Sequence, residues 1–415
     1  MTPEYPTEKA LPFLSAEADS KHYPTMGNLS YTIKSAIADI CDGGLDGRAN
    51  NISIEFERQV TSDLSPIIAS ITIANDGFGV ARKDMRSIAT YSGGIAKGPN
   101  DYGKFQSGMK SASFSLGSRG LIMAKDADGL YKVEWDLTKI IPGGTGYPIR
   151  LSDGTDRDKE YFALKTNASP TGFLLRIDKL HPRVATQDFD ALVGELKAHI
   201  GLTFQNFIEG KRDCPKINFT VNDGAVKAIN PFSNAILRAK KTAIKYGSHR
   251  IGIETFHIPA AHTELPKNLL NQGIYLYRSG RLIAVVREEI AGYTPHNQYN
   301  GFRVYVSYNG HLDEVFKTDI TKTHFDIQKD YAEKIWEVVG HYKKPPEVTY
   351  VPYGTKIKAV KPKDFKTIIL KEKGEHWFNR FDSFKKDPKV DKKALMAIVL
   401  EARKRLAATE KWLTT

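Results

Sequence analysis

The chain has 415 residues, which is enough for two or three domains. Its 41% hydrophobic and 26% charged residues are ordinary for a globular protein, and no apolar run reaches the roughly 18 residues that a membrane-spanning helix needs. The formal net charge of +12 permits binding to nucleic acid or to an acidic membrane surface. Only two cysteines are present, Cys41 and Cys214, without metal-type spacing, and the first residues lack a signal peptide pattern. We therefore expect a cytoplasmic protein that does not enter membranes.

Residues 1–28 are rich in Pro, Glu, Thr and Ser and show little periodicity. This composition is typical of a disordered tail. An arm that becomes ordered when it docks on a partner is the alternative, and the composition alone favours the tail.

A helix is predicted next, in the segment that includes AIADICDGGLDG (36–47). Its apolar positions recur at helical spacing and should face the core: Leu29, Ile33, Ile37 and Ile40. Asp39, Gly43 and Asp46 share a different face, which is either a solvated surface or a ligand site. Because glycine in a helix costs about 1 kcal/mol relative to alanine, the pair Gly43–Gly44 indicates a close approach by another group.

Two strands are predicted over 51–57 and 65–74, paired as a hairpin around 61–63. The first alternates apolar and polar residues, and the second is more continuously apolar. The second strand leads into Asn75-Asp76-Gly77-Phe78-Gly79. Its two glycines allow positive φ and a close approach of backbone to a ligand. An ordinary turn is the alternative.

A glycine-rich segment over 86–108 follows, and its glycines predict a mobile lid: Gly93, Gly94, Gly98, Gly103 and Gly108. The lid ends at Ser107-Gly108-Met109-Lys110-Ser111, which begins a helix of small residues. A helix N-terminus offers free N–H groups and partial positive charge to a phosphate. Lys110 adds a full charge there, and an ordinary surface lysine is the alternative.

The remaining chain is predicted to contain strands within 121–180, a helix over 189–208 and a hairpin over 216–226. A second unit begins near Asn230-Pro231, with three strand-like segments, a turn at Arg278-Ser279-Gly280-Arg281 and a closing helix before Lys343-Lys344-Pro345-Pro346. The lysine-rich end contains a helical pattern over 391–406. It is either a docked helix with a basic face, or a nucleic-acid or dimer surface.

Taken together, the helix, the glycine turn and the glycine-rich helix start resemble the GHKL superfamily, which includes gyrase-type topoisomerases, MutL, heat-shock chaperones, histidine kinases and MORC proteins. The MORC-like and MutL-like branch is the most similar, over roughly residues 29–330. The resemblance implies an α+β fold: a two-layer α/β sandwich (the Bergerat ATP-binding fold), an S5-like α/β transducer domain and a C-terminal helical segment. The expected parts are an arm (1–28), the ATP-binding domain (29–228), the transducer (229–345) and a basic segment (346–415).

The resemblance also implies roles for the first two motifs. Asp39 occupies the position of the family's glutamate general base, and Gly43 that of its Mg²⁺-binding asparagine. Because Gly43 has no side chain, Asp42 or Asp46 is the alternative metal contact. Asn75 occupies the position of the aspartate that accepts the adenine amino group, a bond that an amide oxygen can also accept, although an amide can also donate to a different purine.

The third motif matches at Gly103, Gly108 and Lys110, whereas Gln106 stands where the family has glycine. Thr171 matches the threonine that closes the adenine pocket, and Lys322 resembles the transducer lysine that reaches the terminal phosphate. Arg281 and Arg303 are lesser candidates for that role, and a purely structural role is as plausible for both. The expected nucleotide-binding residues are Asp42, Gly43, Asp46, Asn75, Asp76, Gly77, Gly79, Gly103, Gln106, Ser107, Gly108, Met109, Lys110 and Thr171, with Asp39 and Lys322 as catalytic residues.

By this resemblance the protein is expected to bind ATP with Mg²⁺, to form a homodimeric clamp and to hydrolyse ATP slowly. The basic surplus suggests DNA as the partner, in repair, compaction or defence against foreign DNA, with room for an effector protein. Two alternatives stay open. Gly43 and Gln106 favour a scaffold that holds nucleotide without turnover, and a chaperone-like ATPase would act on protein clients instead of DNA. A histidine kinase is disfavoured, because no phospho-acceptor helix precedes the motifs.

Overall fold

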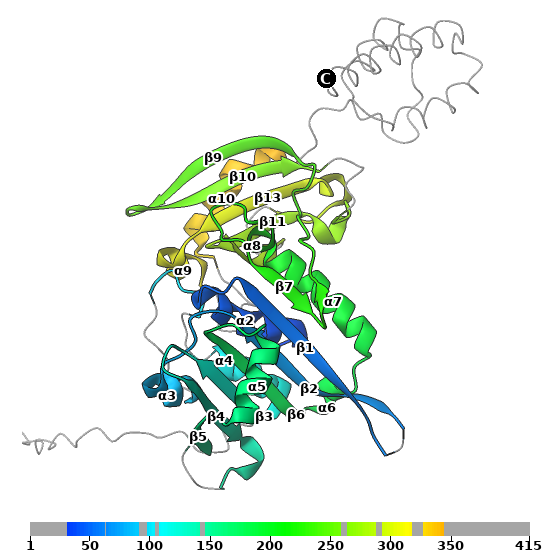
Figure 1. The fold of residues 1–415 in the computed structure, drawn as a ribbon. Helices are drawn as coiled ribbons and strands as arrows, with labels where there is room; N and C mark the ends of the chain where they lie inside the picture. The colour runs from blue at the N-terminus through cyan, green and yellow to red at the C-terminus, as the bar shows by residue number, and fades with distance from the viewer. Residues whose placement is uncertain are drawn as a thin grey trace, which may run out of the picture. The chain divides into compact units, whose positions relative to one another are not determined.

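The computed structural model describes residues 31–62, 64–90, 98–103, 108–141, 146–258, 264–287, 293–317 and 327–343. Within them the chain forms two β-sheets, and both belong to one compact unit of the chain (Figure 1). The expected arm (1–28), residues 91–97 and 104–107 of the expected lid and the basic C-terminal segment lie outside the described residues.

The first sheet has eight strands in the order β5-β4-β3-β6-β2-β1-β7-β8. Its strands are β1 (Asn51–Val60), β2 (Pro66–Asn75), β3 (Gly117–Lys125), β4 (Leu130–Asp136), β5 (Ile149–Asp153), β6 (Gly172–Leu180), β7 (Asn218–Val221) and β8 (Gly224–Ala225). Strands β1 and β7 are parallel, and the other neighbours are antiparallel. The predicted hairpin of two strands around 61–63 is therefore present as β1 and β2.

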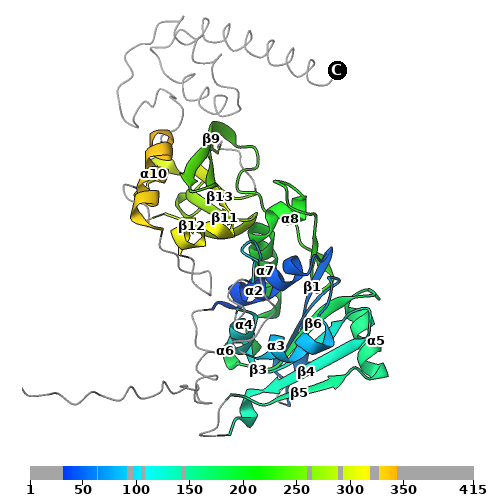
Figure 2. The same ribbon diagram turned by 90° about the vertical axis from the view of Figure 1, so that its left-hand side faces the viewer.

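Helices α2 (Ile33–Asp46), α4 (Gly108–Leu116) and α7 (Phe189–Thr203) cover one face of this sheet, and α5 (Asp156–Lys165) covers the other (Figures 1 and 2). The alternation of β2 divides its side chains between the two faces. Ile71 and Ile73 join the main core under α2 and α4, whereas Ala74 packs with Phe162 of α5. The α+β class expected from the sequence is confirmed, with the layers of a GHKL-type sandwich.

The second sheet has five strands in the order β12-β11-β13-β10-β9. They are β9 (Ile236–Tyr246), β10 (His249–His257), β11 (Gly273–Arg278), β12 (Arg281–Val286) and β13 (Phe302–Tyr308), with α9 (Asp313–Phe316) and α10 (Lys329–Val339) following. Strands β11 and β13 are parallel and the other neighbours antiparallel. Ile274 and Leu276 share a core with α10, whereas Tyr275 and Tyr277 face the opposite way and pack against Leu202 of α7. Strand β11 is thus buried on both faces.

Three features differ from the sequence prediction. Strand β9 and helix α5 were not expected, and the predicted helix over 189–208 is interrupted at Phe204, so that α8 (Gln205–Glu209) is separate. Two short helices, α3 (Met85–Ala89) and α6 (Pro182–Ala185), complete the described α-helices. Single 3₁₀ turns occur at Arg82–Asp84, Leu137–Lys139, Leu269–Asn271, Asn297–Tyr299, Gly310–Leu312 and Gly340–Tyr342. A search of the described helices finds none with the length and apolarity to cross a bilayer.

Candidate nucleotide-binding site

Helix α2 presents the carboxylates of the first motif. It begins after Thr32, whose hydroxyl accepts a hydrogen bond from the Ser35 amide in a capping box. Its apolar residues pack on the sheet, yet Asp39 and Asp42 are also buried, with exposed fractions of 7% and 1%. Buried carboxylates require partners, because transferring a charge out of water is costly. The solvated-face alternative therefore does not hold for Asp39.

The partners of Asp39 and Asp42 come from distant parts of the chain. One oxygen of Asp39 accepts a hydrogen bond from the Tyr31 hydroxyl at 2.8 Å, and the other lies 3.2 Å from Nη2 of Arg281. Nε of Arg281 donates to Asp42 at 2.6 Å. Arg281 is the first residue of β12 and is 4% exposed. The second sheet thus contributes a buried cation to the first motif.

Asp46, at the end of α2, holds the described part of the glycine-rich segment. Its two carboxylate oxygens accept hydrogen bonds from the backbone amides of Tyr102 at 2.8 Å and of Gly103 at 3.0 Å. The carboxylate therefore anchors residues 98–103 to the helix.

The turn after β2 is fixed against the end of α2. The Asn75 side-chain oxygen accepts a hydrogen bond from the Gly77 amide at 3.1 Å. The Phe78 amide donates to the Gly47 carbonyl at 2.9 Å, and a Cβ at Gly77 would lie 2.5 Å from that carbonyl oxygen. Gly79 has φ +73°, and a Cβ there would lie 2.0 Å from the Lys125 carbonyl oxygen. Both glycines are thus required by close approach of backbone to backbone.

Asp76 and Gly44 both contact neighbouring groups of the protein itself. The Asp76 carboxylate accepts hydrogen bonds from the backbone amides of Asn50 and Asn51, at 2.8 and 2.9 Å, and so fixes the start of β1. A Cβ at Gly44 would lie 2.7 Å from the Ile52 side chain and 3.5 Å from Nδ2 of Asn75. The close approach predicted for the glycine pair is therefore found at Gly44, whereas Gly43 is exposed with nothing within 4 Å of such a Cβ.

The start of α4 meets Asp39. A Cβ at Gly108 would lie 3.7 Å from an Asp39 oxygen, so the third motif adjoins the first. Lys110 is 3% exposed, and burial lowers the pKa of its ammonium group to about 8. A surface lysine, the alternative considered for Lys110, is excluded by this burial. Met109 is partly buried against the same core.

Thr171 lies directly before β6, next to the turn. Phe173 of β6 pairs with Asn75 of β2. Gly172 has φ +155°, and a Cβ there would lie 2.4 Å from the Asn75 carbonyl oxygen. The backbone at Thr171 is therefore adjacent to the second motif.

Arg303 is not brought to this place, and three other predicted residues are not described. Gln106, Ser107 and Lys322 lie outside the described residues. Arg303 is fully buried in the second sheet, where its guanidinium donates to the backbone carbonyls of Pro231, Leu265 and Pro266. Arg303 therefore has the structural role that was its alternative. Tyr31 and Tyr102 were missed, because an isolated tyrosine carries no sequence pattern.

The described carboxylates do not form a cage for Mg²⁺. No group of three or more His, Cys, Asp or Glu side chains among the described residues could hold a metal ion. Asp42 bonds to Arg281, Asp46 to two backbone amides, and Gly43 offers no ligand. Because Mg²⁺ demands octahedral oxygen ligation, these residues do not fit a protein-held ion.

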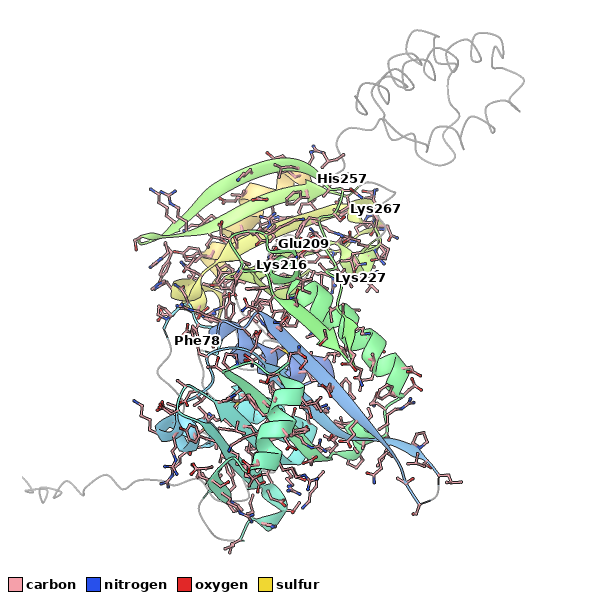
Figure 3. All side chains as sticks on the ribbon, in the orientation of Figure 1. Phe78, Glu209, Lys216, Lys227, His257 and Lys267 are labelled. Atoms are coloured by element: carbon pink, nitrogen blue, oxygen red, sulfur yellow. The ribbon has the colours of Figure 1, made fainter. Side chains whose placement is uncertain are left out.

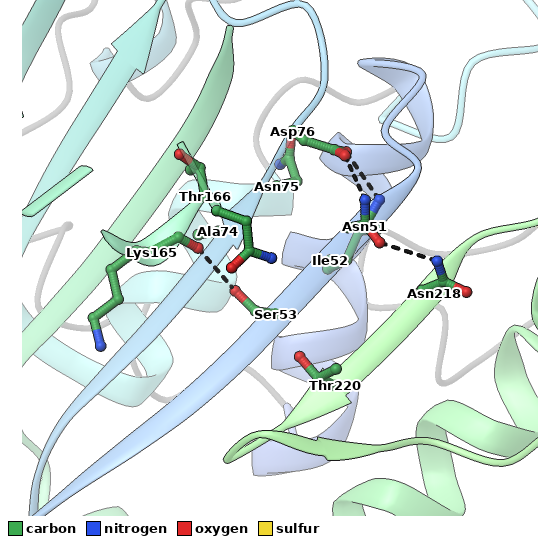
Figure 4. A pocket seen from close by; sticks show the side chains of 11 residues that line it. Asn51, Ile52, Ser53, Ala74, Asn75, Asp76, Lys165, Thr166, Asn218 and Thr220 are labelled. Carbon is green, nitrogen blue, oxygen red and sulfur yellow. Dashed lines mark hydrogen bonds between the residues drawn. The ribbon is translucent and has the colours of Figure 1, made fainter. Parts of the chain in front are cut away.

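A small cavity of about 60 Å³ lies elsewhere, on the face of the sheet that α5 covers (Figure 4). Ser53, Asp76, Lys165 and Thr220 line it, and the hydrogen bond from the Asn218 amide group to the Asn51 side-chain oxygen crosses one side. Ser53 and Thr220 alternate with core residues on their strands, so they point away from α2. The cavity is therefore separated by the sheet from Asp39 and Lys110.

Comparison with protein families supports the assignment of the motifs. Residues 31–151 match the family of histidine kinase-, DNA gyrase B-, and HSP90-like ATPases. The matched region contains α2, the turn after β2 and the start of α4, but neither Thr171 nor the second sheet. No curated protein matches the chain. The match supports the GHKL superfamily and ATP binding for this domain.

Proposed function

We propose that the protein binds ATP between α2, the turn at Asn75–Gly79 and the start of α4, and hydrolyses it slowly. The observation that carries the proposal is the convergence of three motifs on one place. Gly108 adjoins Asp39, Phe78 bonds to Gly47 at the end of α2, and Asp46 holds Gly103. Segments separated by about seventy residues thereby form one site.

The proposed roles follow from the chemistry of the described groups. The amides at the start of α4 and the Lys110 ammonium face the triphosphate, since free N–H groups and a buried cation favour phosphate. Asn75 accepts the adenine amino group through its amide oxygen. Asp39 orients the attacking water. Phosphoryl transfer needs positioning and charge stabilisation more than strong basicity, so an ion-paired aspartate suits this role.

Mg²⁺ is proposed to enter on the triphosphate, because the described carboxylates do not fit a protein-held ion. Bound in this way, the ion would neutralise phosphate charge. Lys322 is proposed to reach the terminal phosphate, as its motif implies.

The direct test compares the wild-type protein with an Asp39→Asn variant. Phosphate release should fall by about 100-fold or more in the variant, the range of general acid–base effects. Affinity for a non-hydrolysable ATP analogue should stay within a few-fold. Equal release rates at background in both proteins contradict hydrolysis and leave a nucleotide-binding scaffold. Two observations favour this scaffold. Gly43 has no side chain to bind a metal, and Tyr31 and Arg281 already donate hydrogen bonds to Asp39.

We further propose a MORC-like or MutL-like dimeric clamp that acts on DNA, with the second sheet as its transducer. The hairpin of β9 and β10, which lies at the top of the coloured ribbon in Figures 1 and 3, supports this proposal. Lys240, Lys245 and Arg250 are exposed along it. Phosphate contacts by such residues give salt-dependent affinity. A mobility-shift assay at two salt concentrations should show binding that weakens as salt rises. Changing all three residues to Gln should weaken the binding further and reduce its dependence on salt. No binding at low salt contradicts the DNA partner and favours protein clients.

A further inference from the structure

The turn between β11 and β12 brings the second sheet into the nucleotide site. Ser279 and Gly280 form this turn with φ of +48° and +88°, and Arg281 follows directly. The Gly280 carbonyl accepts a hydrogen bond at 2.8 Å from the side chain of Asn206 in α8. The tip of the turn is therefore held by α8, and this contact fixes the backbone position from which the Arg281 side chain extends.

Arg281 uses two edges of its guanidinium for two carboxylates. Nε reaches Asp42 at 2.6 Å and Nη2 reaches Asp39 at 3.2 Å. The group is planar and always charged, so it fixes both carboxylates relative to each other, whereas a lysine ammonium is a single flexible point charge. With all three side chains buried, the arrangement has one positive and two negative charges.

The same turn also holds residues 98–103, a described part of the glycine-rich segment. The Tyr102 hydroxyl donates to the Ser279 carbonyl at 2.6 Å, and Arg278 donates to the carbonyls of Asp101 at 3.0 Å and Pro99 at 2.9 Å. Asp313 pairs with Arg278 at 2.7 Å and keeps it oriented. One turn of the second sheet thus contacts both the first motif and residues 98–103.

We infer that Arg281 is a positioning residue for ATP hydrolysis, which holds Asp39 in its working orientation only while the β11–β12 turn is seated against α2. The inference rests on the proposed function and extends it, because it makes hydrolysis depend on the second sheet. Each carboxylate oxygen accepts about two hydrogen bonds, so the bonds from Tyr31 and Arg281 do not by themselves exhaust either oxygen of Asp39. Arg281 binds neither nucleotide nor water in this account.

The chain offers a matched control for loss of contact between the two domains. Arg212, in the loop after α8, forms a two-bond ion pair with Glu254 of β10, at 3.2 and 3.1 Å. It connects the same two parts of the chain but touches none of the motif residues. An Arg212→Met variant therefore removes an interdomain ion pair and leaves Asp39 undisturbed.

The test measures kcat, KM and the affinity for a non-hydrolysable ATP analogue in the full chain. Arg281→Met should lower kcat by about tenfold or more, because small misplacements of reacting groups are costly, with analogue affinity within about threefold. Arg281→Lys should recover part of kcat. Arg212→Met should keep kcat within about twofold of wild type.

Arg281→Met removes the Arg281 cation from two buried carboxylates, which is costly for folding. A second variant therefore separates misfolding from loss of positioning. Arg281→Met combined with Asp42→Asn keeps the local net charge at −1 and should fold, yet kcat should stay low. Wild-type kcat in this double variant, or an equal loss in Arg212→Met, overturns the inference. A wild-type protein that hydrolyses no ATP contradicts the proposed function itself, so the two failures are told apart by the wild-type rate.

Discussion

The two sheets contribute to the candidate site in different ways. The eight-stranded sheet and its helices supply every described motif residue, each within a short stretch of chain whose pattern is recognisable. Among the described residues, the five-stranded sheet contributes the Arg281 side chain, which reaches Asp39 across 242 positions of sequence. The comparison teaches that the motif residues are local in sequence, whereas the proposed positioning of Asp39 by Arg281 is not.

Two buried arginines of the second sheet, Arg281 and Arg303, sharpen this comparison and give the largest expected effect. Arg303 donates to three backbone carbonyls and touches no motif residue. Arg303→Met should lower the free energy of unfolding by about 3 kcal/mol or more, because buried acceptors lose their donors. ATP affinity and kcat of the folded fraction should not change. Urea unfolding and phosphate release measure both quantities, and a selective loss of kcat would contradict a structural role.

The free energy of unfolding should be nearly as sensitive to a substitution in the Asn75–Gly79 turn after β2. Gly79→Ala should cost about 2–3 kcal/mol of unfolding free energy, since positive φ and the Lys125 carbonyl both oppose a Cβ. Gly43→Ala is the control in the same site, because nothing lies near its Cβ. It should stabilise the helix by up to about 1 kcal/mol. Two variants of equal stability in urea unfolding would contradict the described packing.

Two lysines on opposite faces of the first sheet test where the nucleotide binds. Lys110→Met should weaken ATP binding by about tenfold to a hundredfold, the worth of hydrogen bonds to a charged group. Lys165 lines the small cavity under α5 and pairs with Glu55. Lys165→Met should leave ATP affinity unchanged in a calorimetric titration. The reverse pattern would move the site to the other face.

The buried Lys110 ammonium also predicts a pH dependence of stability. Its pKa is about 8 in the folded protein against 10.5 as the ordinary value. Between these pH values the unfolded chain holds more protons on this group, so the free energy of unfolding should rise with pH. Comparing urea unfolding of wild type and Lys110→Met from pH 7.5 to 10 isolates the effect. An identical pH slope in both proteins would contradict the burial of a charged lysine.

The sequence predicted the parts of the fold that have strong local patterns. Helix α2, strands β1 and β2 and the Asn75–Gly79 turn follow directly from periodicity and glycine spacing. Strand β9 was missed because ILRAKKTAIKY lacks a continuous apolar run, and α5 because Phe162 is its only buried apolar residue. The helix break at Phe204 was hidden, because Phe204 and Phe207 are both buried and continue the apolar pattern.

The candidate site was predictable only in part, because some of its contacts come from distant parts of the sequence. Asp39, Gly108 and Lys110 belong to motifs, so their convergence could be expected. The sequence could not distinguish Arg281 from Arg303, because both are strand arginines and only tertiary structure separates their partners. The burial of Asp42 likewise depends on a cation from another sheet.

The most direct test of the central claim is a calorimetric titration of the wild-type chain with a non-hydrolysable ATP analogue and Mg²⁺, repeated with Lys110→Met. The account predicts saturable heat with about one nucleotide per chain in the wild type, and markedly weaker binding in the variant. Absence of heat with any purine triphosphate, or equal affinities in the two proteins, would contradict a nucleotide site between α2, the turn and α4.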